Sequence, residues 1–289
     1  MAAPLLMIDG LTLTAPDSSD GGGWREVLSQ VSCKVAPGEV LGLVGGIGAG
    51  KSMLLQAVSG QLPAGIRWAS GSIELIPGPE RSLHRLPGWM WRDLRRRRLA
   101  WLSRDAAAPW HPGLTMRRQL KEIVAEGARA RELTRESDWL PVLCETGLIE
   151  PESLLGRLPG ELSEPILQRF AIGAGLLRGA DLWIADEPTS ALDATGEDQI
   201  LRLLRDLCAR HRFGLLLATH HLGVIGRVAD RVAVLFEGAV VETGPVKRVL
   251  SRPDHRYTRA LLDCLPRLGE HRTRLGQIDR VSERGALRE

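Results

Sequence analysis

A glycine-rich segment of the sequence has the residue types and spacing of a phosphate-binding loop. "GGIGAGKS", from Gly45 to Ser52, matches GxxxxGKS, follows the apolar run "VLGLV" and precedes a segment with helical spacing. Glycines let successive backbone N–H groups converge on phosphate oxygens, and the positive end of the following helix adds to the attraction. The alternative is a glycine-rich turn in which GKS is accidental. In its strand–loop–helix context, the spacing predicts a site for the phosphates of ATP.

Individual roles follow from the side chains of this loop. Lys51, one of only four lysines in the chain, is expected to reach the β- and γ-phosphates. The Ser52 hydroxyl is expected to coordinate Mg²⁺. The other residues expected to contact the nucleotide are Gly45, Gly46, Ile47, Gly48, Ala49, Gly50 and Met53.

An acidic pair further along the chain has complementary chemistry. In "LWIADEP", an apolar run leads directly into Asp186 and Glu187. At the carboxyl end of a buried strand, Asp186 can complete the Mg²⁺ coordination, and Glu187 can orient or deprotonate an attacking water. Such a run is weak evidence alone, but together with the phosphate loop it predicts ATP binding and hydrolysis.

Alternating apolar and helical segments predict the elements that position these residues. "LLMIDGLTLTA", "VLGLV", "LWIAD", "LLLAT" and "RVAVLF" read as strands, and helical patterns such as "GEDQILRLLRDLCARH" separate several of them. This alternation predicts an α/β fold with a largely parallel sheet. From about Arg81 to Gly160 the composition changes to Arg, Trp and Leu, which predicts an inserted helical subdomain.

Bulk composition excludes several classes of protein. The chain has 289 residues, 44% of them hydrophobic and 25% charged, with a net charge of +3, as in an ordinary globular protein. That charge is too small to imply nucleic acid by itself. Cys33, Cys144, Cys208 and Cys264 are scattered, as idle thiols in a reducing compartment would be. We expect no signal peptide and no membrane span, so membrane association would come through a partner.

"DEPTSALD", Asp186 to Asp193, together with these motifs, resembles the ATP-binding subunits of ABC transporters. The resemblance implies a P-loop NTPase (RecA-like) core, an antiparallel β-subdomain and an inserted helical subdomain. It implies that Asp193 lies in a loop that crosses to the nucleotide site shared with a partner, and that His220 contacts the γ-phosphate. The tail "HRYTRALLDCLPRL" is similar to the oligopeptide, dipeptide and nickel importer branch. Some members of that branch carry a cysteine cluster for an iron–sulfur centre beyond this tail. Here Cys264 is the only cysteine in or near it, so no such cluster is expected.

The same resemblance divides the chain into four ranges. They are 1–85 for the first part of the ATPase core, 86–165 for the helical subdomain, 166–245 for the second part of the core and 246–289 for a C-terminal extension.

The segment "ELSEPILQRFAI" departs from the LSGGQ signature that the family has at this place. In the family, this loop faces the γ-phosphate bound by the other subunit of a dimer. Ser163 is retained and expected to contact that nucleotide, but Glu164 brings negative charge and Pro165 has no N–H to donate. The alternative is that Ser163 to Ile166 only caps a helix. A homodimer would have two poor sites, so we expect a heterodimer with a partner whose signature is intact.

Two further positions depart from the family pattern. Arg104 stands where a glutamine coordinates Mg²⁺; a guanidinium cannot ligate a cation but can pair with phosphate. Alternatively, Arg104 is a surface residue that contacts a partner. The aromatic residue that stacks on adenine is replaced by Ala15, and Trp24 is the nearest substitute. Trp24 could equally pack under the neighbouring loop.

A basic stretch with tryptophans has three interpretations. Arg95 to Arg98 lie between Trp89, Trp91 and Trp101. The stretch could be a solvated helical face with tryptophan packing, a surface that receives a membrane subunit, or a site for single-stranded nucleic acid. We expect no nucleic acid partner.

The resemblance implies an ATPase subunit of an importer at the cytoplasmic face of a bacterial inner membrane. A second ATPase subunit, two membrane permeases and, indirectly, an external substrate-binding protein would complete the machine. The implied cargo is peptides, nickel or a metal chelate. One alternative is a soluble ABC ATPase accessory to an enzyme complex. Another is a regulatory cassette that binds ATP without turnover, against which the presence of Glu187 stands.

Overall fold

The computed structural model describes residues 3–17, 22–78 and 82–263. Cys264, most of the C-terminal extension and residues 18–21, just before Trp24, lie outside the described residues.

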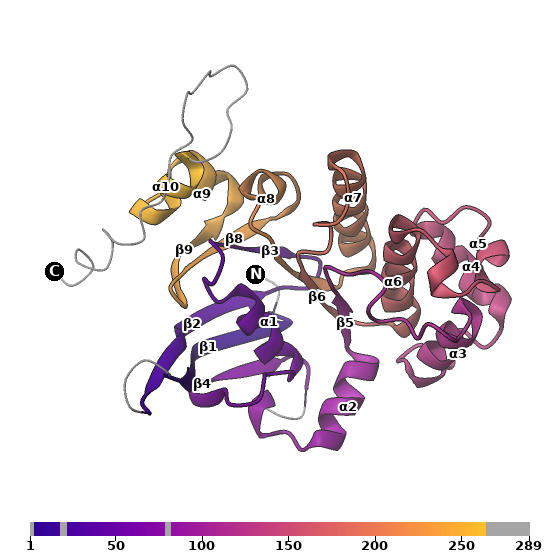
Figure 1. Cartoon of the computed structure of the whole chain (residues 1–289), viewed down its shortest axis with the longest axis horizontal. Helices are drawn as coiled ribbons and strands as arrows, with labels where there is room; N and C mark the ends of the chain where they lie inside the picture. The colour runs from indigo at the N-terminus through magenta and orange to yellow at the C-terminus, as the bar shows by residue number, and fades with distance from the viewer. Residues whose placement is uncertain (1–2, 18–21, 79–81, 264–289) are drawn as a thin grey trace.

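The central element is a six-stranded sheet in the order β5-β6-β7-β3-β8-β9 (Figure 1). All neighbouring pairs are parallel except β8 with β9, which confirms the predicted α/β fold. Elements cover both faces, which explains the continuous apolar runs of its strands. The strands are β3 (Val40–Val44), β5 (Leu99–Leu102), β6 (Leu182–Asp186), β7 (Gly214–Ala218), β8 (Arg231–Phe236) and β9 (Ala239–Pro245).

A second, antiparallel sheet of β1 (Leu6–Pro16), β2 (Trp24–Val35) and β4 (Arg67–Leu75) covers one face of the first. Helix α1 (Lys51–Ser59) lies between the two sheets (Figure 1). It buries Leu54, Leu55 and Val58 in their shared core. The antiparallel β-subdomain expected from the resemblance is therefore present, and it holds the helix that follows the phosphate loop.

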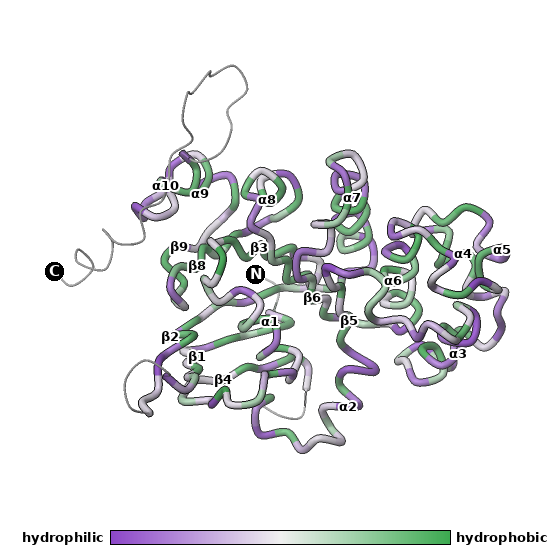
Figure 2. Tube along the Cα trace, in the orientation of Figure 1, coloured by the Kyte–Doolittle hydropathy of each residue, from purple (hydrophilic) through white to green (hydrophobic). Residues whose placement is uncertain are grey.

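The opposite face of the central sheet is covered by helices. Helices α7 (Ala194–His211) and α8 (Leu222–Val228) pack there, followed by α9 (Val246–Ser251) and α10 (Arg256–Asp263). Apolar residues follow the strands between these layers (Figure 2). No helix in the described part of the chain combines the length and apolar character that a bilayer span requires.

The helical subdomain forms one end of the molecule (Figure 1). It contains α3 (Met116–Glu126), α4 (Glu136–Glu145), α5 (Pro151–Leu155) and α6 (Glu164–Arg178), with a short 3-10 turn at Pro159–Glu161 between the last two. A second 3-10 turn, Leu83–Arg85, lies before α2 (Gly88–Arg97) in the chain. The predicted range 86–165 begins too early, because it includes β5, a parallel neighbour of β6. It also ends too early, because α6 packs against α3 and α4. Four residues, "LAWL", are too short for β5 to show a period.

The basic stretch is tied into the fold. It lies on α2 (Gly88–Arg97) and in the turn after it. Arg95 donates to the carbonyls of Ser59 and Gly60, and the three following arginines form ion pairs. These contacts favour the solvated helical face among the three interpretations. The pairs are Arg96–Glu126 (3.1 Å), Arg97–Asp93 (3.0 Å) and Arg98–Asp181 (2.5 Å).

Candidate active site

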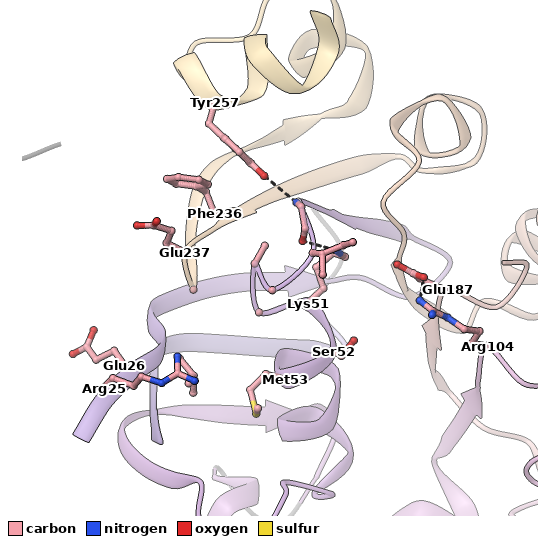
Figure 3. A pocket seen from close by; sticks show the side chains of 17 residues that line it. Arg25, Glu26, Lys51, Ser52, Met53, Arg104, Glu187, Phe236, Glu237 and Tyr257 are labelled. Carbon is pink, nitrogen blue, oxygen red and sulfur yellow. Dashed lines mark hydrogen bonds and ion pairs between the residues drawn. The ribbon is translucent and has the colours of Figure 1, made fainter. Parts of the chain in front are cut away.

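An open cavity of about 1330 Å³ lies over the phosphate loop, between the two sheets and the C-terminal helices (Figure 3). Its size is sufficient for a nucleotide. The lining residues are the loop from Gly46 to Met53, Arg25 to Val27 of β2, Phe236 to Gly238, and Arg104, Glu187 and Tyr257.

Only glycine can follow the path of the phosphate loop at its two ends. A Cβ at Gly45 would lie 2.3 Å from the carbonyl oxygen of Leu235. Gly50, just before α1, has φ +103°, and a Cβ there would lie 2.7 Å from Leu28 Cδ2. Because of these glycines the chain turns tightly from β3 into α1, whose N-terminus points its amides at the cavity.

Lys51 is held inside this loop. Its Nζ donates to the carbonyl of Gly45 at 2.7 Å and to that of Gly46 at 3.0 Å, and the residue is only 7% exposed. Burial lowers the pKa of Lys51, and the nearby charges of Glu187 and Asp186 partly oppose this. The ammonium therefore lies among acceptors and carboxylates that phosphate oxygens can replace.

Ser52 and Asp186 fit a magnesium site. Ser52 lines the cavity, and Asp186 stands at the end of β6, close enough for its charge to act on Lys51. A hydroxyl and a carboxylate, completed by phosphate oxygens and water, are the ligands that Mg²⁺ prefers. When bound there, the ion would neutralise charge on the β- and γ-phosphates.

Glu187 is the most constrained residue of the site. Its φ is +46°, in the left-handed region that a non-glycine residue seldom adopts, and such strain often marks functional positions. One carboxylate oxygen pairs with His220 Nδ1 at 2.9 Å, and the other accepts from Arg104. The Glu187 side chain is 12% exposed, whereas Arg104 is 67% exposed.

Electrostatics keep the Glu187 carboxylate ionised. Burial acts to raise its pKa, but the hydrogen bond and charge of His220 and the charge of Arg104 outweigh burial, so the pKa lies below its usual value. The group is therefore a charged acceptor near neutral pH, as a base or water-orienting group must be. Both carboxylate oxygens of Glu187 already have a hydrogen-bond partner, one in His220 and the other in Arg104.

Sequence reasoning missed the pairing of Arg104 with Glu187. The two residues are 83 positions apart, and β5, the strand that Arg104 follows, was not predicted. The available signal was topological. Because β5 and β6 are parallel neighbours, residues just after both strands meet at the same edge of the sheet.

Five predicted contact residues are not among the described residues that line the cavity. Two of them, Gly45 and His220, contact residues that do, namely Lys51 and Glu187. The other three lie elsewhere. Trp24 carries the Arg67 guanidinium 3.7 Å from its ring centre, while its neighbour Arg25 lines the cavity, so stacking of Trp24 on adenine stays a prediction. Asp193 caps α7 by accepting the Gly196 N–H at 2.8 Å. Ser163 is the N-cap residue of α6, exposed to solvent, and its hydroxyl accepts no capping bond within the described chain.

Comparisons with known proteins agree with this geometry. Residues 28–190 match the family model "ABC transporter", and residues 241–285 match "Oligopeptide/dipeptide transporter, C-terminal region". The nickel import ATP-binding protein NikD of Rhodospirillum rubrum is 36% identical, over 89% of this chain and 93% of the relative. The peptidoglycan transport ATP-binding protein YejF of Agrobacterium fabrum is 36% identical over 91% of this chain, which spans about half (47%) of that relative.

A solved structure agrees with the fold. The structure of cbiO1 from Clostridium perfringens, part of the ABC transporter complex cbiONQ, superposes with a TM-score of 0.70 at 25% identity. The match covers 86% of this chain and 91% of that one.

Proposed function

The chain belongs to the ABC transporter family and is an ABC-type ATPase, and from this premise we propose that it is one of two different ATPase subunits of a bacterial importer. It would bind the cytoplasmic face of the inner membrane through two permeases. An external binding protein would deliver the substrate to these permeases. The proposed cargo is peptides, nickel or a metal chelate. The name of the relative NikD supports nickel, and that of the C-terminal family model supports peptides. Neither name supports the alternative of an accessory to an enzyme complex.

The observation that carries the ATPase role is the convergence of Lys51, Glu187 and Arg104 around one cavity. Lys51 and the α1 N-terminus hold the phosphates of ATP. Glu187 orients the attacking water and takes its proton, while His220 fixes one oxygen of the carboxylate. Capture of the chain with membrane permeases from solubilised membranes tests the transport assignment; recovery with a soluble enzyme complex instead would support the alternative.

Arg104 must leave Glu187 before that carboxylate can accept a proton. Its side chain is two-thirds exposed (67%) and lines the cavity, so it is free to turn towards an incoming γ-phosphate. A guanidinium pairs well with phosphate oxygens. Binding of ATP would thus both engage Arg104 and release one oxygen of the base, which ties activation of the carboxylate to the presence of a γ-phosphate.

Arg104→Ala should weaken binding of ATP to the isolated chain by roughly 10-fold or more, since a hydrogen bond to a charged group contributes about 1.5–3 kcal/mol. ADP, which lacks the γ-phosphate, should lose less. Calorimetry with both nucleotides measures the difference. Arg117→Ala is the matched control, because Arg117 also pairs with a carboxylate, that of Glu136, on the distant helical subdomain. Equal losses for ATP and ADP would contradict the contact with the γ-phosphate.

The start of α6 supports a heterodimer. Glu164 and Pro165 occupy the first turn of this helix, where free backbone N–H groups would face a partner's phosphate. Proline removes one of those donors, and the carboxylate of Glu164 repels an anion. The site completed by this segment would be poor, so a competent site needs the partner's signature.

The isolated chain should accordingly hydrolyse ATP barely above background, and a partner subunit with an intact signature should restore turnover. Phosphate release from the purified chain, alone and after co-expression with its partner, measures this. Robust activity of the single subunit that disappears in Glu187→Gln would contradict the asymmetry.

A further inference from the structure

Tyr257, in the first turns of α10, reaches the phosphate loop from the C-terminal part of the chain (Figure 3). Its hydroxyl accepts the backbone N–H of Gly46 at 2.9 Å, and the residue is only 3% exposed. Its ring packs on Phe236, with centroids 4.2 Å apart. It is the only tyrosine of the chain.

The start of α10 is itself anchored to the central sheet. The carboxylate of Glu242, on β9, accepts the N–H groups of Asp254 at 2.9 Å and His255 at 3.1 Å. The ring nitrogen Nδ1 of His255 then accepts the N–H of Tyr257 at 3.1 Å. An unbroken series of contacts therefore joins β9 to the hydroxyl that meets Gly46, and Tyr257 approaches the loop from a fixed base.

Gly46 is clamped from two sides. Its N–H donates to Tyr257, and its carbonyl accepts from Lys51. Beyond it, Ile47 is 87% exposed, and a Cβ placed at Gly48 would meet no atom within 4 Å, so the outer part of the loop is open to solvent. The Gly46 carbonyl also accepts the N–H of Ala49 at 3.2 Å, a bond within the loop itself. When Lys51 turns to a phosphate, Tyr257 continues to hold the Gly46 peptide from outside the loop.

We propose that Tyr257 is a positioning residue of the nucleotide site, which pre-organises the phosphate loop and couples it to the C-terminal extension. A glycine-rich loop loses much conformational freedom when it closes on a ligand. A hydrogen bond that fixes Gly46 beforehand lowers that cost and so strengthens nucleotide binding. Because coupling is reciprocal, a bound nucleotide also stabilises the contact between α10 and the phosphate loop. The inference rests on the proposed ATP site.

Tyr257→Phe tests this directly, because it removes the hydroxyl and keeps the ring against Phe236. With one neutral hydrogen bond contributing about 0.5–1.5 kcal/mol, the Kd for ATP of the full chain should rise roughly 2- to 10-fold by calorimetry. Amide exchange of the loop peptide containing Gly46 should become faster in the nucleotide-free protein. In the assembled complex, KM should rise while kcat stays near wild type, as expected when uniform binding is lost.

Thr243→Val is the matched control. It also deletes a hydroxyl that bonds a backbone group, the carbonyl of Val232 at 3.1 Å, but on β9 away from the loop. Its ATP affinity should equal that of wild type. If wild type and Thr243→Val bind ATP and Tyr257→Phe binds it equally well, the positioning role is wrong while the ATP site stands. If wild type does not bind ATP, the proposed function itself fails.

Glu242→Gln provides a second variant in case Tyr257→Phe misfolds. It weakens the anchor of α10 without touching the cavity, because the carboxylate that holds Asp254 and His255 loses its charge. A smaller loss of ATP affinity, with faster exchange at Gly46, is expected. Unchanged affinity and exchange in this variant would overturn the coupling of the extension to the loop.

Discussion

Lys51→Ala should abolish measurable binding of ATP to the isolated chain. The ammonium is the buried cation at the centre of the phosphate loop, and its loss leaves the incoming β- and γ-phosphates facing the carboxylates of Glu187 and Asp186 without compensation. Two charge-assisted bonds contribute about 1.5–3 kcal/mol each, so affinity should fall by roughly 100-fold or more. Calorimetry with ATP and Mg²⁺ gives the value directly.

Two controls protect the interpretation of that experiment. Lys121→Ala removes an exposed lysine from α3 and should leave ATP affinity unchanged. A thermal melt of Lys51→Ala checks that freeing the carbonyls of Gly45 and Gly46 does not unfold the loop. A folded Lys51→Ala protein with wild-type affinity would show that the cavity is not the phosphate site.

The phosphate loop could be predicted from sequence because its geometry is local. Within eight residues, residue type and spacing predict three features: glycines at positions where a Cβ would clash, a helix N-terminus and a lysine directed at the phosphates. The parallel sheet was also predictable, since strands buried on both faces carry continuous apolar runs. Short elements were not. The strand β5 has four residues, and no periodic signal separates it from the arginines before it.

Contacts between distant segments account for what the sequence did not reveal at the site. The hydroxyl of Tyr257 meets a residue 211 positions away, and Arg104 meets Glu187 across 83. Both contacts depend on which strands neighbour each other in the sheet, and spacing along the chain does not encode that. For His220, the resemblance predicted a contact with the γ-phosphate but not its pairing with the Glu187 carboxylate, which the structure shows at 2.9 Å.

Glu187→Gln should remove most ATPase activity and transport from the assembled complex. The amide keeps the shape of the carboxylate but cannot take a proton from water, and loss of a general base costs roughly 10²–10⁴-fold in rate. ATP should still bind and hold the dimer closed. Phosphate release measures the rate, and transport assays measure the coupled loss.

Glu145→Gln is the matched control for this substitution. Glu145 also pairs with a histidine and an arginine, His211 at 2.8 Å and Arg210 at 3.4 Å, but between α4 and α7, away from the cavity. Removing its charge disturbs a similar ion-pair cluster without touching nucleotide. Its turnover should stay near wild type, which separates the chemistry of Glu187 from the general effect of breaking such a cluster.

Replacing both Glu164 and Pro165 with glycine should have the opposite outcome in the same complex. In the proposed heterodimer these residues would face a nucleotide site of the partner that is already poor. Restoring an N–H donor and removing a negative charge there should leave transport intact or modestly raise ATPase activity. The contrast between the two variants identifies the competent site. If Glu187→Gln kept near wild-type turnover while the double-glycine variant lost it, hydrolysis would occur at the site that "LSEPI" completes. The asymmetric pairing would then be wrong, because catalysis would need the helix end at which Pro165 removes an N–H donor.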